Sequence, residues 1–225
     1  MKRSALEPDL DDLPRTIPIF PLNGALLLPG GRLPLNIFEP RYLAMVADAL
    51  SSSHRLIGMI QTNDVNTQDG LPPMIYNTGC VGRISSFEES SDGRYLISLD
   101  GLVRFNVEQE IDMKNDYRRV QARYDRFKHD LDMVTPDVDR DMLLGALKKY
   151  FDQKGFTADW DAIRACESEK LVTTLSMICP FGVQDKQALL EADTVTTRAL
   201  TLTALLEMAN SEKAFLSSER PDVRH

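Results

Sequence analysis

The sequence predicts an α+β protein, with a β-rich N-terminal half that contains one helix and a helical C-terminal half. Between residues 15 and 127, apolar side chains mostly alternate with polar ones, which is the pattern of a half-buried strand. Beyond Asp130 the apolar period lengthens to about 3.6 residues, the period of an amphipathic helix. The pair Asp92-Gly93 separates two β-rich runs and predicts a hairpin turn.

The N-terminal half is expected to begin with an extended segment followed by a helix. Residues 17–22 contain two prolines, which suits an edge strand because proline cannot donate a hydrogen bond to a sheet. The Pro-Gly-Gly sequence at residues 29–31 predicts a turn, and an apolar run follows at residues 33–38. A helix is expected over residues 40–50, because proline suits its first turn and apolar side chains recur at helical spacing.

Strands and then helices make up the rest of the chain. With a second break at Asp100-Gly101, strands are expected at residues 56–61, 81–87, 94–99, 102–107 and 117–127. Thr135-Pro136 can cap and start the first C-terminal helix, which Gly155 stops. Further helices are expected at residues 160–165, 168–178, 185–191 and 195–209.

These elements predict five segments along the chain. A flexible acidic tail, a β domain, a linker, a helical bundle and a second flexible tail are expected at residues 1–14, 15–127, 128–136, 137–216 and 217–225. The sequence shows no internal repeat and no low-complexity tract.

Composition and charge narrow the class of function. The 225 residues carry 26 Lys and Arg against 34 Asp and Glu, a formal net charge of −8. A general nucleic-acid binder or a protein that adheres to anionic membranes needs a basic surface, so both are disfavoured. The three cysteines are widely spaced and predict neither a disulfide framework nor a zinc ribbon. Without a secretory signal or an apolar membrane span, the protein is expected to be cytoplasmic.

Several short motifs occur in a specific order. They are Ile17-Pro18-Ile19-Phe20-Pro21-Leu22, Leu28-Pro29-Gly30, Pro34-Leu35-Asn36-Ile37-Phe38-Glu39-Pro40-Arg41-Tyr42, Gly79-Cys80-Val81-Gly82-Arg83-Ile84, Asp92-Gly93-Arg94-Tyr95, Gly101-Leu102-Val103-Arg104-Phe105, and Asp185-Lys186-Gln187 with Leu189-Leu190-Glu191. Across about residues 15–210, the chain resembles the N-terminal substrate-binding domain of the ATP-dependent protease Lon. The resemblance implies a PUA-like β pseudo-barrel followed by a helical bundle.

The catalytic modules of a full-length Lon have no counterpart in the sequence. A P-loop needs the pattern Gly-x-x-x-x-Gly-Lys-Ser/Thr to cradle phosphates, and the chain contains no such pattern. Only a short segment follows the last predicted helix. The chain is therefore expected to be a stand-alone Lon-type N-domain that is not an enzyme and needs no cofactor.

Other chemically active residues have a structural explanation. His54, His129 and His225 are expected to be solvated, and no metal-ligand spacing appears. The acidic run at residues 137–141 resembles the start of a calcium loop but lacks the required glycine and the final acid. Glu39 and Arg41 would suit acid–base or anion-binding work, but an ion pair at the start of a helix is the favoured interpretation.

Apolar side chains offer the most specific candidate site. The leucines Leu26 to Leu28 are consecutive, and a strand buries only alternate residues on one face, so at least one is expected to face a groove or solvent. Methionine and aromatic side chains suit a surface that accepts varied apolar segments. The candidate peptide- or partner-binding residues are Leu27, Leu28, Phe38, Tyr42, Met59 and Met74. The pseudo-barrel core is the alternative place for most of them.

The sequence therefore predicts a non-enzymatic module that binds exposed apolar segments of unfolded or degron-like polypeptide, or a partner protein. An adaptor is the first alternative, in which the helical half docks onto a protease or chaperone while the β half holds cargo. RNA binding is a second alternative, by analogy with other PUA-like folds, although the acidic balance disfavours it. A small-molecule hydrolase that uses Glu39, Arg41 and His54 ranks last.

Overall fold

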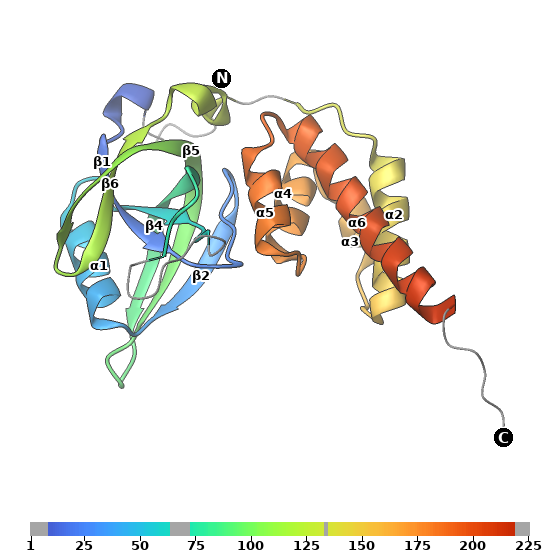
Figure 1. Ribbon diagram of the computed structural model, residues 1–225, viewed down its shortest axis with the longest axis horizontal. Coiled ribbons are helices and arrows are strands. Elements are labelled where there is room, and N and C mark those ends of the chain that lie inside the picture. Colours follow the sequence, from blue (N-terminus) through green and yellow to red (C-terminus); the bar gives the residue numbers. More distant parts are fainter. Residues whose placement is uncertain (1–8, 64–72, 133–134, 219–225) are drawn as a thin grey trace. The chain divides into compact units, whose positions relative to one another are not determined.

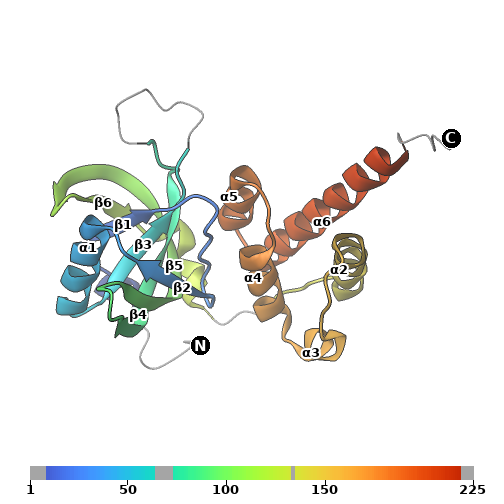
Figure 2. The same ribbon diagram turned by 90° about the horizontal axis from the view of Figure 1, so that it is seen from below.

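The computed structural model describes residues 9–63, 73–132 and 135–218, with side chains up to residue 211. By its contacts the chain divides into two compact units. The barrel unit takes the residues before Thr135 together with Met177–Glu191, and the helical unit takes Thr135–Ser176 with the residues from Ala192 onward. Figures 1 and 2 show the strands in the first unit and a group of helices in the second, which confirms the predicted α+β class.

Six strands of the barrel unit form one sheet that closes on itself (Figure 1). They are β1 (Thr16–Pro21), β2 (Arg32–Ile37), β3 (Leu56–Ile60), β4 (Thr78–Glu89), β5 (Tyr95–Lys114) and β6 (Tyr117–Arg123). The strand order is β2-β5-β4-β3-β1-β6, and an additional pairing of β5 with β6 closes the barrel. β2 lies outside this closure and pairs only with β5 among the described residues.

Two turns set the register of the long strands. The predicted hairpin between β4 and β5 is confirmed, and Gly93 adopts the positive φ of 78° that such a turn requires. The predicted break at Asp100-Gly101 is wrong, because β5 runs through both residues, with only a register shift against β4 directly after Gly101. Gly101 instead allows a close approach, since a Cβ atom there would lie 2.1 Å from the Leu28 carbonyl oxygen. The next turn falls at Asn115-Asp116, where both residues have positive φ.

Short 3-10 helices flank the barrel strands on either side. Helix η1 (Leu10–Asp12) precedes β1, and the adjoining Leu13 is buried in the core although it falls in the predicted N-terminal tail. The predicted strand at 117–127 ends at Arg123, and helix η3 (Asp125–Leu131) follows it. The remaining residues of that predicted tail, 1–8, lie outside the described part of the chain.

The barrel interior is filled by alternate residues of its strands. Ile17, Val103, Phe105 and Val120 are fully buried there, as the period of two predicts. Helix α1 (Pro40–Ser51) packs against β1, β3 and β6. It begins at the predicted proline.

Helix α5 (Val183–Glu191) belongs to the barrel unit, although it falls within residues 137–216, which the sequence assigns to the helical bundle. Polar side chains hold it there. Lys186 Nζ donates to the Gly24 carbonyl at 2.6 Å, and Gln187 Nε2 donates to the Thr78 carbonyl at 3.2 Å. Both side chains are buried, and each has a barrel carbonyl group as a hydrogen-bond partner. The domain boundaries themselves stay a prediction.

The described part of the helical unit contains four helices, α2 (Arg140–Lys154), α3 (Trp160–Ala165), α4 (Ser168–Ile178, whose last two residues are assigned to the barrel unit) and α6 (Val195–Ser218). α2 and α6 pack side by side (Figure 2). α2 starts later than Thr135-Pro136 because the Asp139 carboxylate caps it, accepting from the Met142 N–H at 2.9 Å. It ends before Gly155, as predicted.

No helix within the described ranges combines the length and the apolar content that crossing a membrane requires.

Candidate functional site

The six predicted binding residues fall into two groups. Leu27, Leu28, Tyr42 and Met59 are buried in the barrel unit, whereas Phe38 is 60% exposed and Met74 is 53% exposed. The expectation that at least one of the three consecutive leucines faces a groove or solvent is wrong, because all three are buried. They lie in an irregular segment between β1 and β2, where the alternation of a strand does not apply.

The buried members of the set have packing roles. The Tyr42 ring lies 4.3 Å from the Phe20 ring, and the Arg41 guanidinium lies 4.5 Å from the Tyr42 ring centre. Burial raises the pKa of the Tyr42 hydroxyl. Arg41 donates to the Glu39 carboxylate at 2.7 Å, the ion pair expected at the start of α1.

The two exposed members lie in different parts of the barrel unit. Met74 precedes an isolated bridge between Thr62 and Ile75, and its carbonyl accepts from the Asn63 N–H at 2.7 Å. Phe38 directly follows the last residue of β2. The Arg94 guanidinium lies 5.6 Å from the Phe38 ring centre.

Phe38 has one exposed apolar neighbour on the adjacent strand. Leu96 lies opposite Asn36 in the β2–β5 register, so the alternation of side chains places it on the same face as Phe38. Leu96 is 43% exposed. Phe87 on β4 is 44% exposed, but it lies opposite Ile97 with its ring 5.0 Å from that of Tyr95, so it belongs to the other face of the sheet. We call Phe38 and Leu96 the edge patch.

Sequence reasoning missed one member of the edge patch, Leu96, and also the exposed Phe87 on the other face of the sheet. Tyr95, Ile97 and Leu99 alternate along β5, so Leu96 lies on the opposite face from the buried Ile97 and Leu99. An apolar leucine at a position where the alternation predicts a polar residue could have been noticed in the sequence. Phe87 continues the apolar set of β4, and its exposure follows from its place at the outer end of the strand.

The backbone of β2 offers a free edge beside the patch. The Gly101 N–H donates to the Gly31 carbonyl at 2.8 Å, which marks a hydrogen-bonded pair just before β2. Because hydrogen-bonded and non-hydrogen-bonded pairs alternate, the even-numbered residues Arg32, Pro34 and Asn36 turn their backbone groups away from β5. Pro34 has no N–H, and its place at the free edge leaves no ladder bond unmade.

The charges around the edge patch are mainly acidic. Glu88 lies opposite Leu96 and Glu89 opposite Tyr95, and neither carboxylate forms an ion pair with a described residue. At the far end of β2, Arg32 donates to Asp100 at 2.6 Å, and this hydrogen bond lowers the pKa of the Asp100 carboxyl.

Candidates for catalysis or metal binding are not brought together in the part of the chain that the structure describes. There, no three His, Cys, Asp or Glu side chains cluster closely enough to hold a metal ion. His129 pairs with Asp132 at 3.0 Å. Cys80 and Cys179 are buried cysteines, and burial raises the pKa of the Cys179 thiol to about 11.

Comparison with known proteins decides the family. The model of the substrate-binding domain of ATP-dependent protease La (Lon) matches residues 16–208. The chain belongs to this family. The predicted resemblance is thereby confirmed, and the matched range covers both the barrel strands and the helices through most of α6.

Relatives of the chain are Lon proteases. A Lon protease of Anaeromyxobacter dehalogenans (strain 2CP-C) is 29% identical over 141 residues, which are 62% of this chain and 16% of that protein. The Lon protease of Cytophaga hutchinsonii is 25% identical over 89% of this chain and 25% of its own length. The chain thus spans a quarter or less of these two curated relatives, and it matches their substrate-binding part.

Solved structures show the same fold. The crystal structure of a Lon N-terminal domain protein from Xanthomonas campestris has a TM-score of 0.59 at 23% identity, covering 84% of this chain and 97% of that one. The N-terminal domain of a Mycobacterium avium complex Lon protease has a TM-score of 0.55 at 14% identity, covering 88% and 98%.

Proposed function

We propose that this chain is a non-enzymatic module that binds an extended apolar segment of unfolded or degron-like polypeptide along the free edge of β2. The observation that carries the proposal is a strand with one partner, β5, that ends beside the exposed Phe38. Membership of the Lon substrate-binding domain family supports a polypeptide as the ligand.

Main-chain pairing would supply the part of the affinity that does not depend on sequence. The outward backbone groups of Arg32, Pro34 and Asn36 can pair with an added strand, as in other cases of β-augmentation. The missing N–H of Pro34 limits this pairing, and an edge proline also restrains edge-to-edge aggregation.

Apolar contacts would supply the preference for unfolded segments. The exposed side chains of the edge patch are Leu96 on β5 and Phe38 directly after β2, so one extended segment that continues past Ile37 can meet both of them. Unfolded polypeptide exposes large apolar side chains that folded proteins bury. The module can therefore distinguish an unfolded polypeptide from a folded one.

The first test measures the affinity of a fluorescent peptide with a Leu-Phe-Val centre by anisotropy. We expect Phe38→Ser and Leu96→Ser each to weaken binding by about tenfold, because each removes an apolar contact worth about 1.5 kcal/mol. Met113→Ser is the matched control. Met113 is 63% exposed near the other end of β5, so its loss is expected to leave the affinity unchanged.

A peptide with N-methylated backbone at alternate positions tests the pairing to β2. We expect weaker binding when the methyl groups face the strand and normal binding when they face away. Equal affinity of Phe38→Ser, Met113→Ser and the unaltered chain would contradict the proposed site. Binding of RNA in place of peptide, weakening steeply with salt, would instead favour the RNA-binding alternative.

A further inference from the structure

A second concave site lies in the barrel unit and uses no residue of β2 or of the edge patch. It is a hollow of about 210 Å³ between the C-terminal end of α1, β1 and β6. Ile17, Ala49, Leu56 and Tyr117 contribute buried apolar surface to its lining. The volume is smaller than the roughly 300 Å³ at which pockets for drug-sized ligands begin, so the hollow suits a single compact group.

One carboxylate in the hollow is already balanced by its neighbours. Asp48 accepts from the Tyr117 hydroxyl at 2.8 Å and from Asn115 Nδ2 at 3.2 Å. Lys114 Nζ lies 3.1 Å from the same carboxylate oxygen. The charges of Asp48 and Lys114 therefore offset each other within the lining.

The charge that remains is positive. Arg119 donates from Nε and Nη2 to the Asp112 carbonyl at 3.0 and 2.8 Å, a neutral partner, and its guanidinium forms no ion pair with a described residue. Its Nη1 group has no hydrogen-bond partner among the described residues. His54 also lines the hollow, and only its Nδ1 atom has a partner there, the Ser53 hydroxyl at 3.1 Å.

We propose that this hollow binds a carboxylate carried on a compact apolar group, with Arg119 as the anion-binding residue. A guanidinium with unused N–H donors matches a carboxylate in charge and geometry. The buried apolar lining takes the attached side chain. This chemistry is that of the C-terminal residue of a polypeptide and equally that of a free small carboxylic acid.

The test compares an acid with its amide on the unaltered chain. In a ¹H–¹⁵N NMR titration, N-acetyl-leucine is expected to shift the amide signals of Ile17, His54 and Arg119. N-acetyl-leucinamide has the same apolar group without the charge, and we expect its binding to be weaker by about tenfold or more. Equal binding of the two compounds, or no shift at these residues with either, would overturn the proposal.

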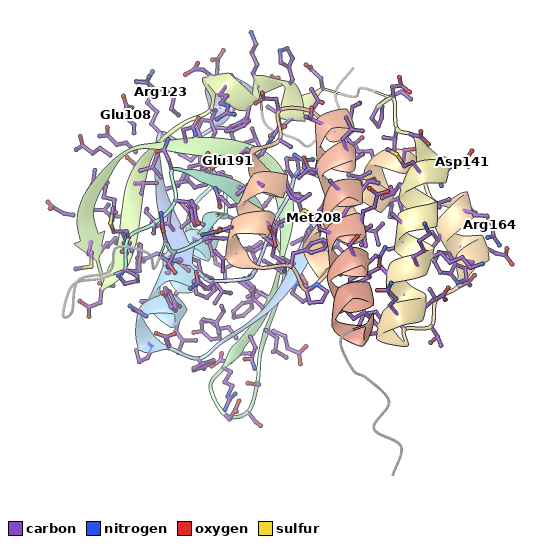
Figure 3. The ribbon with its side chains drawn as sticks, turned by 45° about the vertical axis from the view of Figure 1, so that its right-hand side comes forward. Glu108, Arg123, Asp141, Arg164, Glu191 and Met208 are labelled. Carbon is purple, nitrogen blue, oxygen red and sulfur yellow. The ribbon has the colours of Figure 1, made fainter. Side chains whose placement is uncertain are left out.

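A pair of variants on one strand locates the anion contact. Arg119→Gln is expected to lower the affinity for N-acetyl-leucine to that of the amide. Arg123→Gln is the control, because Arg123 pairs with Glu108 outside the hollow (Figure 3) and should bind as the unaltered chain does. Unchanged affinity in Arg119→Gln would contradict the assignment, and the acid–amide comparison still decides if that variant unfolds.

A third ligand tests whether the carboxylate belongs to a polypeptide C-terminus or to a free small acid. A peptide ending in a free leucine carboxylate should bind more tightly than N-acetyl-leucine if the hollow reads polypeptide C-termini, and equally if it binds free acids. Both results support the site. The result is independent of the β2 proposal, because a C-terminally amidated peptide should keep its affinity for the edge patch.

Discussion

At the scale of single residues, one buried ion pair joins three parts of the barrel unit. Arg104 on β5 lies 2.7 Å from Asp130 in η3, and the two side chains are 2% and 10% exposed. Arg104 also donates to the Leu190 carbonyl of α5 at 2.9 Å. Its guanidinium lies 4.3 Å from the Phe127 ring centre. A buried charge of this kind is tolerated only while its partners are in place.

Asp130→Asn is therefore expected to destabilise the protein by about 3–5 kcal/mol, because it leaves the Arg104 charge buried without a counter-charge. Urea unfolding measures the change as a shift in midpoint at constant slope. Asp92→Asn is the control, because its pair with Arg94 is exposed and should contribute less than about 1 kcal/mol. Similar small losses in both variants would contradict the role of the buried pair.

A second prediction at this scale concerns acid stability. The hydrogen bond from the Tyr117 hydroxyl lowers the pKa of the Asp48 carboxyl below its usual value. A lowered pKa in the folded state means that Asp48 stabilises the fold above the usual value of about 3.9, and that this contribution is lost as the pH falls through the folded-state pKa.

Tyr117→Phe keeps the ring and removes only the hydroxyl. We expect the pKa of Asp48 to rise toward its usual value, which a ¹³C NMR titration of the carboxyl measures directly. The difference in stability between the variant and the unaltered chain should be largest at neutral pH and shrink as the pH falls below about 4. An unchanged pKa would show that Lys114 and Asn115 alone hold it down.

At the scale of elements, close backbone approaches decide where the strands run. The Gly101 backbone packs against the irregular segment that holds Leu28, and this contact fixes three leucines in the core. Gly101→Ala is expected to destabilise the barrel unit, because its Cβ would overlap the Leu28 carbonyl and one of the two segments must move.

The same glycine-to-alanine change at Gly145 is expected to stabilise the protein, in contrast to Gly101→Ala. Gly145 lies within α2, and apart from its chain neighbours and the helix's own nearby backbone nothing lies within 4 Å of a Cβ built there. The alanine should raise stability by roughly 0.5–1 kcal/mol, because glycine in a helix loses more conformational entropy on folding. Thermal unfolding of both variants measures these effects, and a stable Gly101→Ala protein would contradict the described packing.

Much of the fold could be predicted because its signals are local. Pro40, Gly93 and Gly155 act through their own backbone preferences, and each marks the boundary that the sequence predicts. The break expected at Asp100-Gly101 failed because the function of Gly101 depends on a segment about seventy residues away in the chain.

The candidate site was harder to predict for the same reason. Whether Leu27 and Leu28 are exposed depends on the path of an irregular segment, which no periodic pattern encodes. The exposure of Leu96 depends on strand register, and its odd phase in β5 was the only local sign. Phe38 was found because aromatic side chains suit a surface that accepts varied apolar segments, and the same argument also selected Tyr42 and Met59, which are buried.

At the scale of the whole molecule, the barrel unit is discontinuous in sequence. Met177–Glu191 belongs to it. In α5, Lys186 donates a hydrogen bond to the Gly24 carbonyl and Gln187 donates one to the Thr78 carbonyl. A chain that ends at residue 134 loses these contacts and the Leu190 carbonyl that Arg104 binds. We expect such a fragment to unfold at a lower temperature than the barrel unit of the full chain.

Adding a synthetic peptide of residues 177–191 to that fragment should restore part of the lost stability. Circular dichroism melting with and without the peptide measures the effect. A fragment that melts like the full chain, and that the peptide does not stabilise, would show that the barrel strands form a domain without α5.

The central claim is that extended apolar polypeptide binds at the free edge of β2 next to Phe38. Its most direct test places a photoreactive phenylalanine analogue at position 38, or at the exposed position 113, and irradiates each protein with the labelled Leu-Phe-Val peptide. The account predicts a covalent adduct at position 38 that unlabelled peptide suppresses, and none at position 113. Peptide binding without an adduct at position 38, or with equal adducts at both positions, would contradict it.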